Sequence, residues 1–194
     1  RLLVERTNSE LILMRFADPS PGIWRIVVEP QQLADGIFHM WLPVTEFLTG
    51  DVYFLQSNPD TTITEPGNTP DPMTVASYNG ADKSIAIDSG RGYTRDGRLK
   101  PEFAAPGVDV MGAVSRGQFT RTGSSIATGI TAGATALLFE WIVYQLGRTN
   151  IDSIQLKNLM ILGTERKDTE VYPNRSWGYG SLNLYNTFEQ LRTF

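Results

Sequence analysis

The sequence predicts an α/β protein whose N-terminal part is rich in strands and whose remainder mixes strands with long helices. Before position 58, apolar residues alternate along the chain with no helical spacing between them, which is typical of half-buried strands. After position 72, short apolar runs are followed by two long helical patterns, which indicates strands covered by helices. The stretch 58–72 contains four prolines and is predicted to be a linker or surface loop.

This change in the pattern of apolar residues divides the chain into a β-rich segment, residues 1–57, and an α/β part, residues 58–194. In the first part, an apolar run at 11–16 and alternation at 23–28 and 37–42 predict strands. Strands at this spacing suggest part of a sandwich or jelly roll.

The second part is expected to contain three short strands and two long helices. The expected strands are 73–78, 84–87 and 108–111, and the expected helices are about 125–146 and 151–162, the second starting near Asn150 or Asp152. Residues 182–191 fit either a final strand or a short helix. Gly129 and Gly133 lie on one face of the longer helix, and each costs about 1 kcal/mol relative to alanine. We expect a neighbouring backbone to approach closely there in compensation.

Composition excludes several classes of function. The net charge is −4 and the basic residues form no stripe, which argues against a nucleic-acid partner. The absence of cysteine excludes a disulfide framework, a thiolate metal site and a cysteine nucleophile. No metal-ligand spacing is present, so neither a metal nor another cofactor is expected. The longest apolar stretch, 126–146, carries Thr128, Thr131 and Glu140, which favours a core helix over a membrane span. We therefore expect no membrane partner.

Ser125 is the residue on which a functional interpretation depends. It follows Gly123 and Ser124 at the expected start of a long helix, where backbone N–H groups lack partners and the helix dipole favours negative charge. An oxyanion formed by attack of Ser125 on a carbonyl would be stabilised in that position. The residue types leave a second interpretation open, because Ser124 or Ser125 would equally cap the helix.

Other candidate groups are given structural interpretations. His39 is the only histidine and lies in alternating strand sequence, so we do not expect it to be a catalytic base. Asp96, Arg98 and Glu102 suggest an ion site or an acid–base pair. A turn that shapes the approach to residues 104–107 explains them better.

Three ordered motifs resemble the signatures of subtilisin-like serine peptidases. Residues 123–127, followed by the alanine- and glycine-rich 132–138, resemble the family's nucleophile motif. Residues 89–92 and 96–107 resemble its Ser-x-Arg-Gly loop and its Asp-Gly-Arg-x-Lys-Pro-x-x-x-Ala-Pro-Gly segment. Residues 177–183 resemble its closing Gly-x-Gly-x-Val-Asn segment. The resemblance implies the C-terminal portion of a subtilisin-like three-layer α/β fold.

The resemblance narrows at residues 128–133, where Gly129 and Ile130 replace the Pro and His of many family members. This segment is closer to the clostridial spore-germination branch, whose members carry a jelly-roll domain inserted in the peptidase domain. Residues 1–57 look like the end of such an insert. The branch implies a spore-associated or extracellular location.

The family's chemistry implies a serine endopeptidase that cleaves peptides or proteins through an acyl-enzyme on Ser125. The Ser125 backbone N–H would supply one oxyanion donor. The resemblance also places Thr64 and Glu65 near the wall of the first specificity pocket. Glu65 there would favour a basic substrate side chain. The alternative, that Glu65 is a solvated loop carboxylate, stays open.

Part of the family's machinery has no matching motif in this sequence. The catalytic Asp, the catalytic His and the oxyanion Asn precede the segment at Thr61 in the family's order. The chain opens at Arg1 in strand-like sequence, so we expect a piece of a longer polypeptide that is inactive alone and needs the N-terminal part of the same peptidase. The alternative is a catalytically inactive relative that binds or regulates a partner in spore germination. A binding module in residues 1–57 is a third possibility without recognisable ligand residues.

Overall fold

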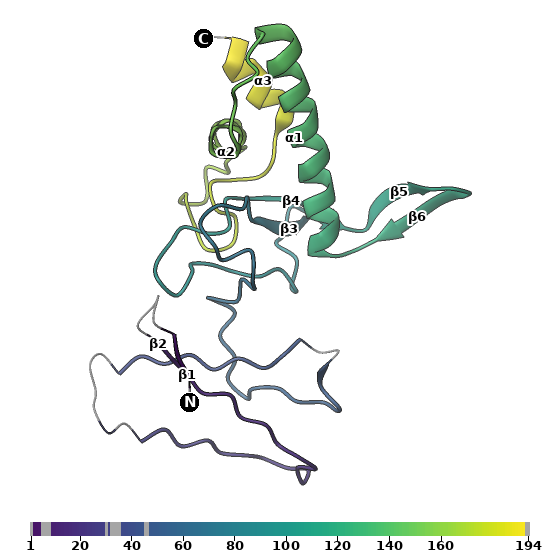
Figure 1. Ribbon diagram of the computed structural model, residues 1–194. Helices are drawn as coiled ribbons and strands as arrows, with labels where there is room; N and C mark the ends of the chain where they lie inside the picture. The colour runs from purple at the N-terminus through teal and green to yellow at the C-terminus, as the bar shows by residue number, and fades with distance from the viewer. Residues whose placement is uncertain (1, 5–8, 30, 32–35, 45–46, 193–194) are drawn as a thin grey trace. The chain divides into compact units, whose positions relative to one another are not determined.

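The computed structural model describes residues 2–4, 9–29, 31, 36–44 and 47–192. The chain divides into two units, Arg1–Tyr53 and Phe54–Phe194. The first is built from extended segments, and the second contains the three helices and the larger sheet (Figure 1).

In the first unit, β1 (Leu2–Val4) pairs antiparallel with β2 (Ser9–Leu11). Beyond β2, the described residues of this unit form no further strand, so the strands predicted at 11–16, 23–28 and 37–42 are wrong. Extended backbone becomes a strand only when a neighbouring strand pairs its N–H and C=O groups. The described part of the unit supplies that pairing to β1 and β2 alone. The jelly-roll interpretation therefore remains a prediction.

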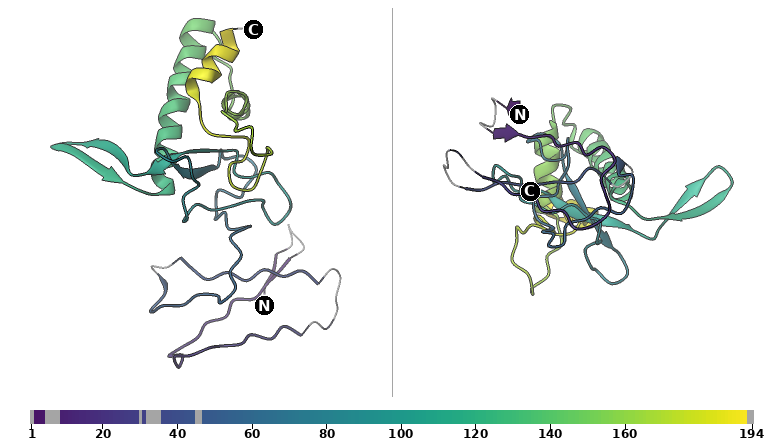
Figure 2. Two further views of the ribbon diagram at one scale, coloured as in Figure 1. Left: turned by 180° about the vertical axis from the view of Figure 1, so that it is seen from behind. Right: turned by 90° about the horizontal axis from the view of Figure 1, so that it is seen from below.

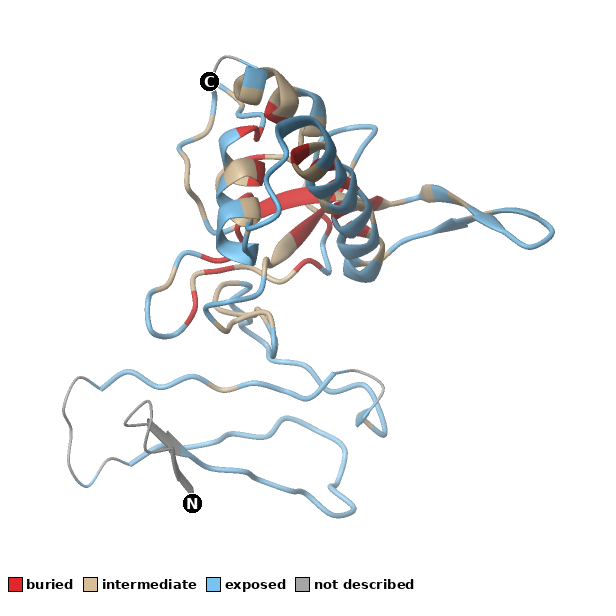
Figure 3. Cartoon of the chain, turned by 45° about the horizontal axis from the view of Figure 1, so that its top comes forward, coloured by how far each residue is buried: buried red, intermediate tan, exposed pale blue. Residues whose placement is uncertain are grey.

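Most large apolar side chains of the first unit are exposed, as the pale blue lower trace of Figure 3 shows. Its described residues belong to neither buried hydrophobic cluster of the chain. Local ring contacts are found instead: Phe16 packs edge-on against Trp24 at 5.4 Å, and His39 stacks on Trp41 at 5.2 Å.

The sheet of the second unit is built on a parallel pair of strands, β3 (Val75–Asn79) and β4 (Phe103–Val108). The C-terminal segment continues the sheet on the other side of β4. There the Ala104 N–H donates to the Gly180 carbonyl at 2.9 Å, and the Leu182 N–H donates to the Ala104 carbonyl at 2.7 Å. A parallel strand pair with helices packed beside it confirms the predicted α/β class.

Three helices pack beside this sheet: α1 (Ser124–Leu146), α2 (Ser153–Leu162) and α3 (Leu184–Arg192) (Figure 1). The first two confirm the predicted helices, and α3 confirms the helical alternative for 182–191 from Leu184 onward. A capping box starts α2, because the Asp152 carboxylate accepts from the Gln155 N–H while the Gln155 side chain accepts from the Asp152 N–H.

The core lies where α1 and α2 meet β4. Phe103, Leu138, Ile142 and Met160 are almost fully buried there. Figure 3 shows the buried residues gathered on β3, β4 and the sides of the helices that face them.

The long helix α1 is covered on one face only. Its buried residues recur every three or four positions and are Ala127, Thr131, Ala134, Leu138 and Ile142. Elsewhere on the helix, Leu137 is 56% and Tyr144 is 78% exposed. The expected close approach at Gly129 and Gly133 is wrong for this chain, because nothing lies within 4 Å of a Cβ added at either glycine.

By length and composition, α1 would also pass as a membrane span. It is the one described helix that does so, and the core helix of a soluble protein passes the same test. Its buried threonine, Thr131, and its packing against β4 are typical of a core helix. The absence of a membrane partner stays a prediction.

A hairpin, β5 (Val110–Val114) with β6 (Gly117–Arg121), joins β4 to α1. Figures 1 and 2 show it projecting away from the helices of its unit. The strand predicted at 108–111 therefore falls on the end of β4 and the start of β5. The strand predicted at 84–87 is wrong, because only an isolated bridge between Tyr78 and Ile85 forms there.

Candidate active site

Ser125 lies in the first turn of α1, and its side chain is exposed. The helix is capped by Gly123, with φ 152° and ψ 156°, and no side chain caps it. The interpretation of Ser124 or Ser125 as a cap is therefore wrong. An N-terminal cap accepts through its side chain from the following turn, whereas Gly123 fills that position with backbone alone. In the described part of the chain, neither serine hydroxyl is used to cap the helix.

The backbone at the start of α1 presents donors to solvent. The Ile126 and Ala127 N–H groups both donate to the Gly123 carbonyl, at 3.0 and 3.4 Å. Within the described residues, no acceptor is recorded for the N–H of Ser125. The first turn of α1 contains no acidic side chain that would occupy the positive end of the dipole. The Ser125 N–H is thus available to a developing oxyanion.

The end of β4 fixes this helix start. The Gly123 N–H donates to the Gly107 carbonyl at 2.8 Å. A Cβ added at Gly107 would lie 2.2 Å from Ser77 Oγ and 2.9 Å from the Gly123 carbonyl oxygen, so only glycine permits this approach. Residues 104–107 therefore belong to a strand whose end holds the start of the helix.

Thr64 and Glu65 lie on an exposed segment that enters a turn at 65–68. Neither residue lines a described cavity together with Ser125. Ser125 also lines neither of these two cavities, so the specificity pocket stays a prediction.

The three charged residues Asp96, Arg98 and Glu102 do not form one site. Asp96 pairs with Arg98 at 2.8 Å in an exposed turn. The hydrogen bond from Arg98, with a second from Thr94, lowers the pKa of Asp96 from its ordinary 3.8 to about 2.

Glu102 is buried away from that turn, in a separate network. Its carboxylate pairs with buried Lys100 at 2.7 Å and with Lys157 at 3.5 Å, and it accepts from the Thr74 N–H. Lys100 also donates to the Pro72 carbonyl at 2.6 Å. Within the described residues, no group of three acidic, histidine or cysteine side chains is arranged to hold a metal. The network is structural: it ties β4 to the segment before β3 and to α2.

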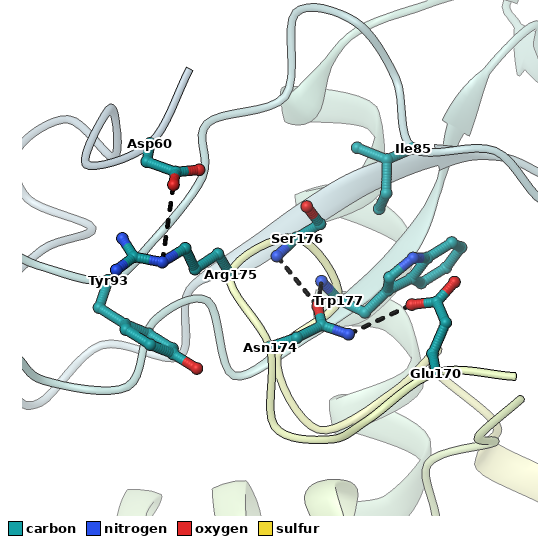
Figure 4. Close-up of a pocket in the computed structure, with 8 residues that line it drawn as sticks. All are labelled: Asp60, Ile85, Tyr93, Glu170, Asn174, Arg175, Ser176 and Trp177. Atoms are coloured by element: carbon teal, nitrogen blue, oxygen red, sulfur yellow. Dashed lines mark hydrogen bonds and ion pairs between the residues drawn. The ribbon is translucent and has the colours of Figure 1, made fainter. Parts of the chain in front are cut away.

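The largest described cavity, about 570 Å³, lies elsewhere in the second unit (Figure 4). It is lined by Asp60, Ile85, Tyr93, Glu170, Asn174, Arg175, Ser176 and Trp177. Sequence reasoning missed this cluster, because its members come from four separate loops. Figure 4 shows the Arg175 side chain directed toward Asp60, with Glu170 on the opposite side of Asn174.

Comparison with known proteins defines the class. The family model described as "Subtilase family" matches residues 49–180, and the chain belongs to that family. The chain is 30% identical over 154 residues to the serine protease AprX of Bacillus subtilis (strain 168), covering 68% of this chain and 33% of AprX. It is 32% identical over 98 residues to the C5a peptidase of Streptococcus pyogenes, covering 50% of this chain and 8% of that protein.

Solved structures agree on the fold. The CspB protease of Clostridium perfringens superposes with a TM-score of 0.68 at 32% identity, covering 72% of this chain and 31% of that one. The chain thus spans about a third of AprX and of CspB. These matches confirm the subtilisin-like α/β fold and the similarity to a clostridial member.

Proposed function

We propose that Ser125 is the nucleophile of a subtilisin-like serine endopeptidase whose remaining catalytic groups come from residues outside this chain. The proposal rests on one observation: Ser125 is exposed in the first turn of α1 and does not cap the helix, in a member of the subtilase family. A serine that merely caps a helix would have its hydroxyl bonded to the first turn, and here it does not.

The chemistry follows from the position of Ser125. Its Oγ attacks the scissile carbonyl carbon, and the carbonyl oxygen becomes an oxyanion beside the Ser125 N–H. As the C–N bond breaks, the amine departs with the proton that the base took from the Ser125 hydroxyl, and water then hydrolyses the acyl-enzyme, which restores Ser125. A serine hydroxyl is a weak nucleophile without a base, so the histidine, the aspartate and a second oxyanion donor must come from the N-terminal part of the peptidase.

A comparison of neighbouring serines tests the proposal in the complete peptidase, meaning this chain together with the residues expected to precede it. Ser125→Ala should lower peptide cleavage by at least about 10³-fold. Ser124→Ala is the matched control, since Ser124 is equally exposed, and it should keep most of the activity. An unsubstituted peptidase with intact catalytic Asp and His that cleaves no peptide would favour the alternative, a binding or regulatory relative.

We also propose that Glu65 selects basic substrate side chains. Its exposure leaves the carboxylate free to pair with an incoming Lys or Arg. Removing the charge should reduce the preference for a basic over a neutral side chain next to the scissile bond, and Glu65→Gln keeps the shape of the side chain. We expect about a 3- to 10-fold smaller preference, because a partly exposed ion pair contributes little more than 1 kcal/mol.

Peptide libraries measure this preference directly. Glu189→Gln is the control, since Glu189 accepts from Arg192 on α3 and belongs neither to the Glu65 turn nor to the cavity of Figure 4. An unchanged preference after Glu65→Gln would show that Glu65 is a solvated loop carboxylate.

We also propose that the N-terminal part of the peptidase covers the exposed face of α1. Large apolar side chains, among them Leu137 and Tyr144, are exposed along the helix, and the small residues Gly129 and Gly133 leave room beside it. An apolar helix face of this kind is typical of a surface that another element covers. Cover by the rest of the same fold would bury α1 on all sides.

A further inference from the structure

We infer that Arg175 is a positioning residue that fixes the Thr64–Glu65 wall of the specificity pocket, and this inference rests on the proposed function. Arg175 contacts no catalytic group in the described chain. It acts on the segment 60–63, which leads directly into Thr64 and Glu65. Its partners are the charged, aromatic and backbone groups that line the cavity of Figure 4.

The guanidinium of Arg175 joins three segments that are distant in sequence. Its Nε pairs with Asp60 Oδ2 at 3.6 Å, and its Nη1 donates to the Gly92 carbonyl at 3.2 Å. The guanidinium carbon lies 4.8 Å from the centre of the Tyr93 ring. The planar fork of arginine serves all three contacts at once, which an ammonium would not do.

The backbone repeats the same link. The Gly92 N–H donates to the Arg175 carbonyl at 2.8 Å, while the Thr61 N–H donates to the Gly92 carbonyl at 3.2 Å. The Thr62 N–H donates to the Arg91 carbonyl at 2.9 Å, and Thr62 Oγ1 accepts from the Arg91 N–H at 3.0 Å. Residues 91–92 therefore form hydrogen bonds both with Arg175 and with the segment 61–62 that leads into Thr64 and Glu65.

Arg175 is itself held on a rigid loop. Asn174 Oδ1 accepts from the Ser176 and Trp177 N–H groups, at 3.1 and 2.8 Å. Asn174 and Gly178 exchange backbone hydrogen bonds of 2.9 and 3.0 Å. Trp177 is only 5% exposed, and the centre of its ring lies 5.2 Å from that of Tyr78. Movement of the wall away from Arg175 would thus require breaking contacts on a loop fixed to the sheet.

The far end of the wall is fixed independently. The Thr69 N–H donates to the Pro66 carbonyl at 3.0 Å and closes the turn after Glu65. Gly67 lies against Thr74, with 3.2 Å between an added Cβ and Thr74 Cγ2. The wall is therefore a short bridge between two anchors, and Arg175 supplies the side-chain part of the first.

The cavity does not itself need a ligand to account for its charges. Arg175 is paired with Asp60, and the Glu170 carboxylate accepts from Asn174 at 3.2 Å. Both charged ends are occupied by partners within the chain, which favours an anchoring role over the capture of a small molecule.

Hydrogen exchange on the 194-residue chain tests the anchor without reference to catalysis. Arg175→Ala should accelerate exchange of the Thr61 and Thr62 amides by about threefold or more, since local opening no longer breaks the guanidinium contacts. Arg166→Ala is the control, because exposed Arg166 donates to the Tyr179 carbonyl and does not contact the wall segment. Unchanged exchange in Arg175→Ala would overturn the inference.

Kinetics of the complete peptidase test the consequence for specificity. Arg175→Ala should raise KM for a basic peptide about threefold or more with little change in kcat, since a loosened wall weakens binding and leaves the chemistry intact. Arg175→Lys should recover part of the loss through its charge beside Asp60. Faster exchange with no change in KM would overturn the link between Arg175 and specificity. Absence of any cleavage by the unsubstituted peptidase would instead refute the proposed function, and exchange would still decide the anchor.

Discussion

Gly123 determines what Ser125 is able to do. With a φ of 152°, Gly123 holds a backbone conformation that other residues rarely adopt, and it caps α1 without a side chain. A serine at that position would cap the helix by accepting a hydrogen bond from the first turn through its hydroxyl. The sequence carried this signal, since glycine precedes two serines, but residue preferences alone favour serine as the cap. Helix-cap statistics therefore could not separate a nucleophile from a cap.

Asp96 gives a pH-dependent prediction at the same scale. The Arg98 and Thr94 hydrogen bonds hold the pKa of Asp96 near 2, below its ordinary 3.8. Its carboxylate therefore stabilises the fold fully above about pH 4, and this contribution is lost as the pH falls toward 2. Asp96 is about half exposed, so solvent screening limits the contribution to under about 1 kcal/mol.

Urea unfolding of Asp96→Asn checks this. The variant should be less stable than the unsubstituted chain at pH 7, and the difference should shrink steadily as the pH falls from about 4 to 2. A difference that stays constant between pH 7 and pH 2.5 would show that the Asp96 charge is not its source.

At the scale of elements, the capping box of α2 is the clearest local stabiliser. Asp152 accepts from the Gln155 N–H at 2.7 Å, and Gln155 Oε1 accepts from the Asp152 N–H at 3.1 Å. Asp152→Ala should lower the free energy of unfolding by about 1 kcal/mol. Asp168→Ala is the control for loss of an exposed aspartate outside a helix cap. Equal denaturant midpoints for the two variants would exclude a stabilising cap.

Helices were predicted well because their signals are local. The apolar pattern of α1 and the cap of α2 each depend on residues that are close together in sequence, and the structure confirms both helices. Strands were predicted less well, because a strand exists only through its partner. β4 contains Pro106 and Gly107 and has little alternation, yet it pairs with β3 and with the C-terminal segment. The alternating runs in the first unit lack such partners within the described residues.

The candidate site was predicted only in part. The order of the motifs points to Ser125 as the proposed nucleophile, because the residues of that motif are contiguous in sequence. The contacts of Arg175 were not predicted, because Asp60, Gly92 and Arg175 meet only through folding.

At the scale of the whole molecule, Gly129 distinguishes the chain alone from the complete peptidase. In the chain, an added Cβ at Gly129 meets nothing within 4 Å, so Gly129→Ala should stabilise it by up to about 1 kcal/mol. If the N-terminal part packs closely on this face of α1, the same methyl should weaken its association. Gly97→Ala is not equivalent, since Gly97 has a φ of 80° that strains alanine.

Thermal melting measures the stability of the Gly129→Ala chain, and a binding assay measures its association with the N-terminal part. Stabilisation of the chain together with weaker association with the N-terminal part is the expected result. Stabilisation in both states would show that the face stays open in the complete peptidase.

The central claim is that Ser125 becomes a nucleophile only when a second stretch of polypeptide supplies its base. The most direct test is mass spectrometry of fluorophosphonate labelling, on the chain alone and on the complete peptidase. We expect rapid, stoichiometric modification of Ser125 in the complete peptidase and almost none in the chain alone. Rapid labelling of the chain alone, or labelling of the complete peptidase at another residue, would contradict this account.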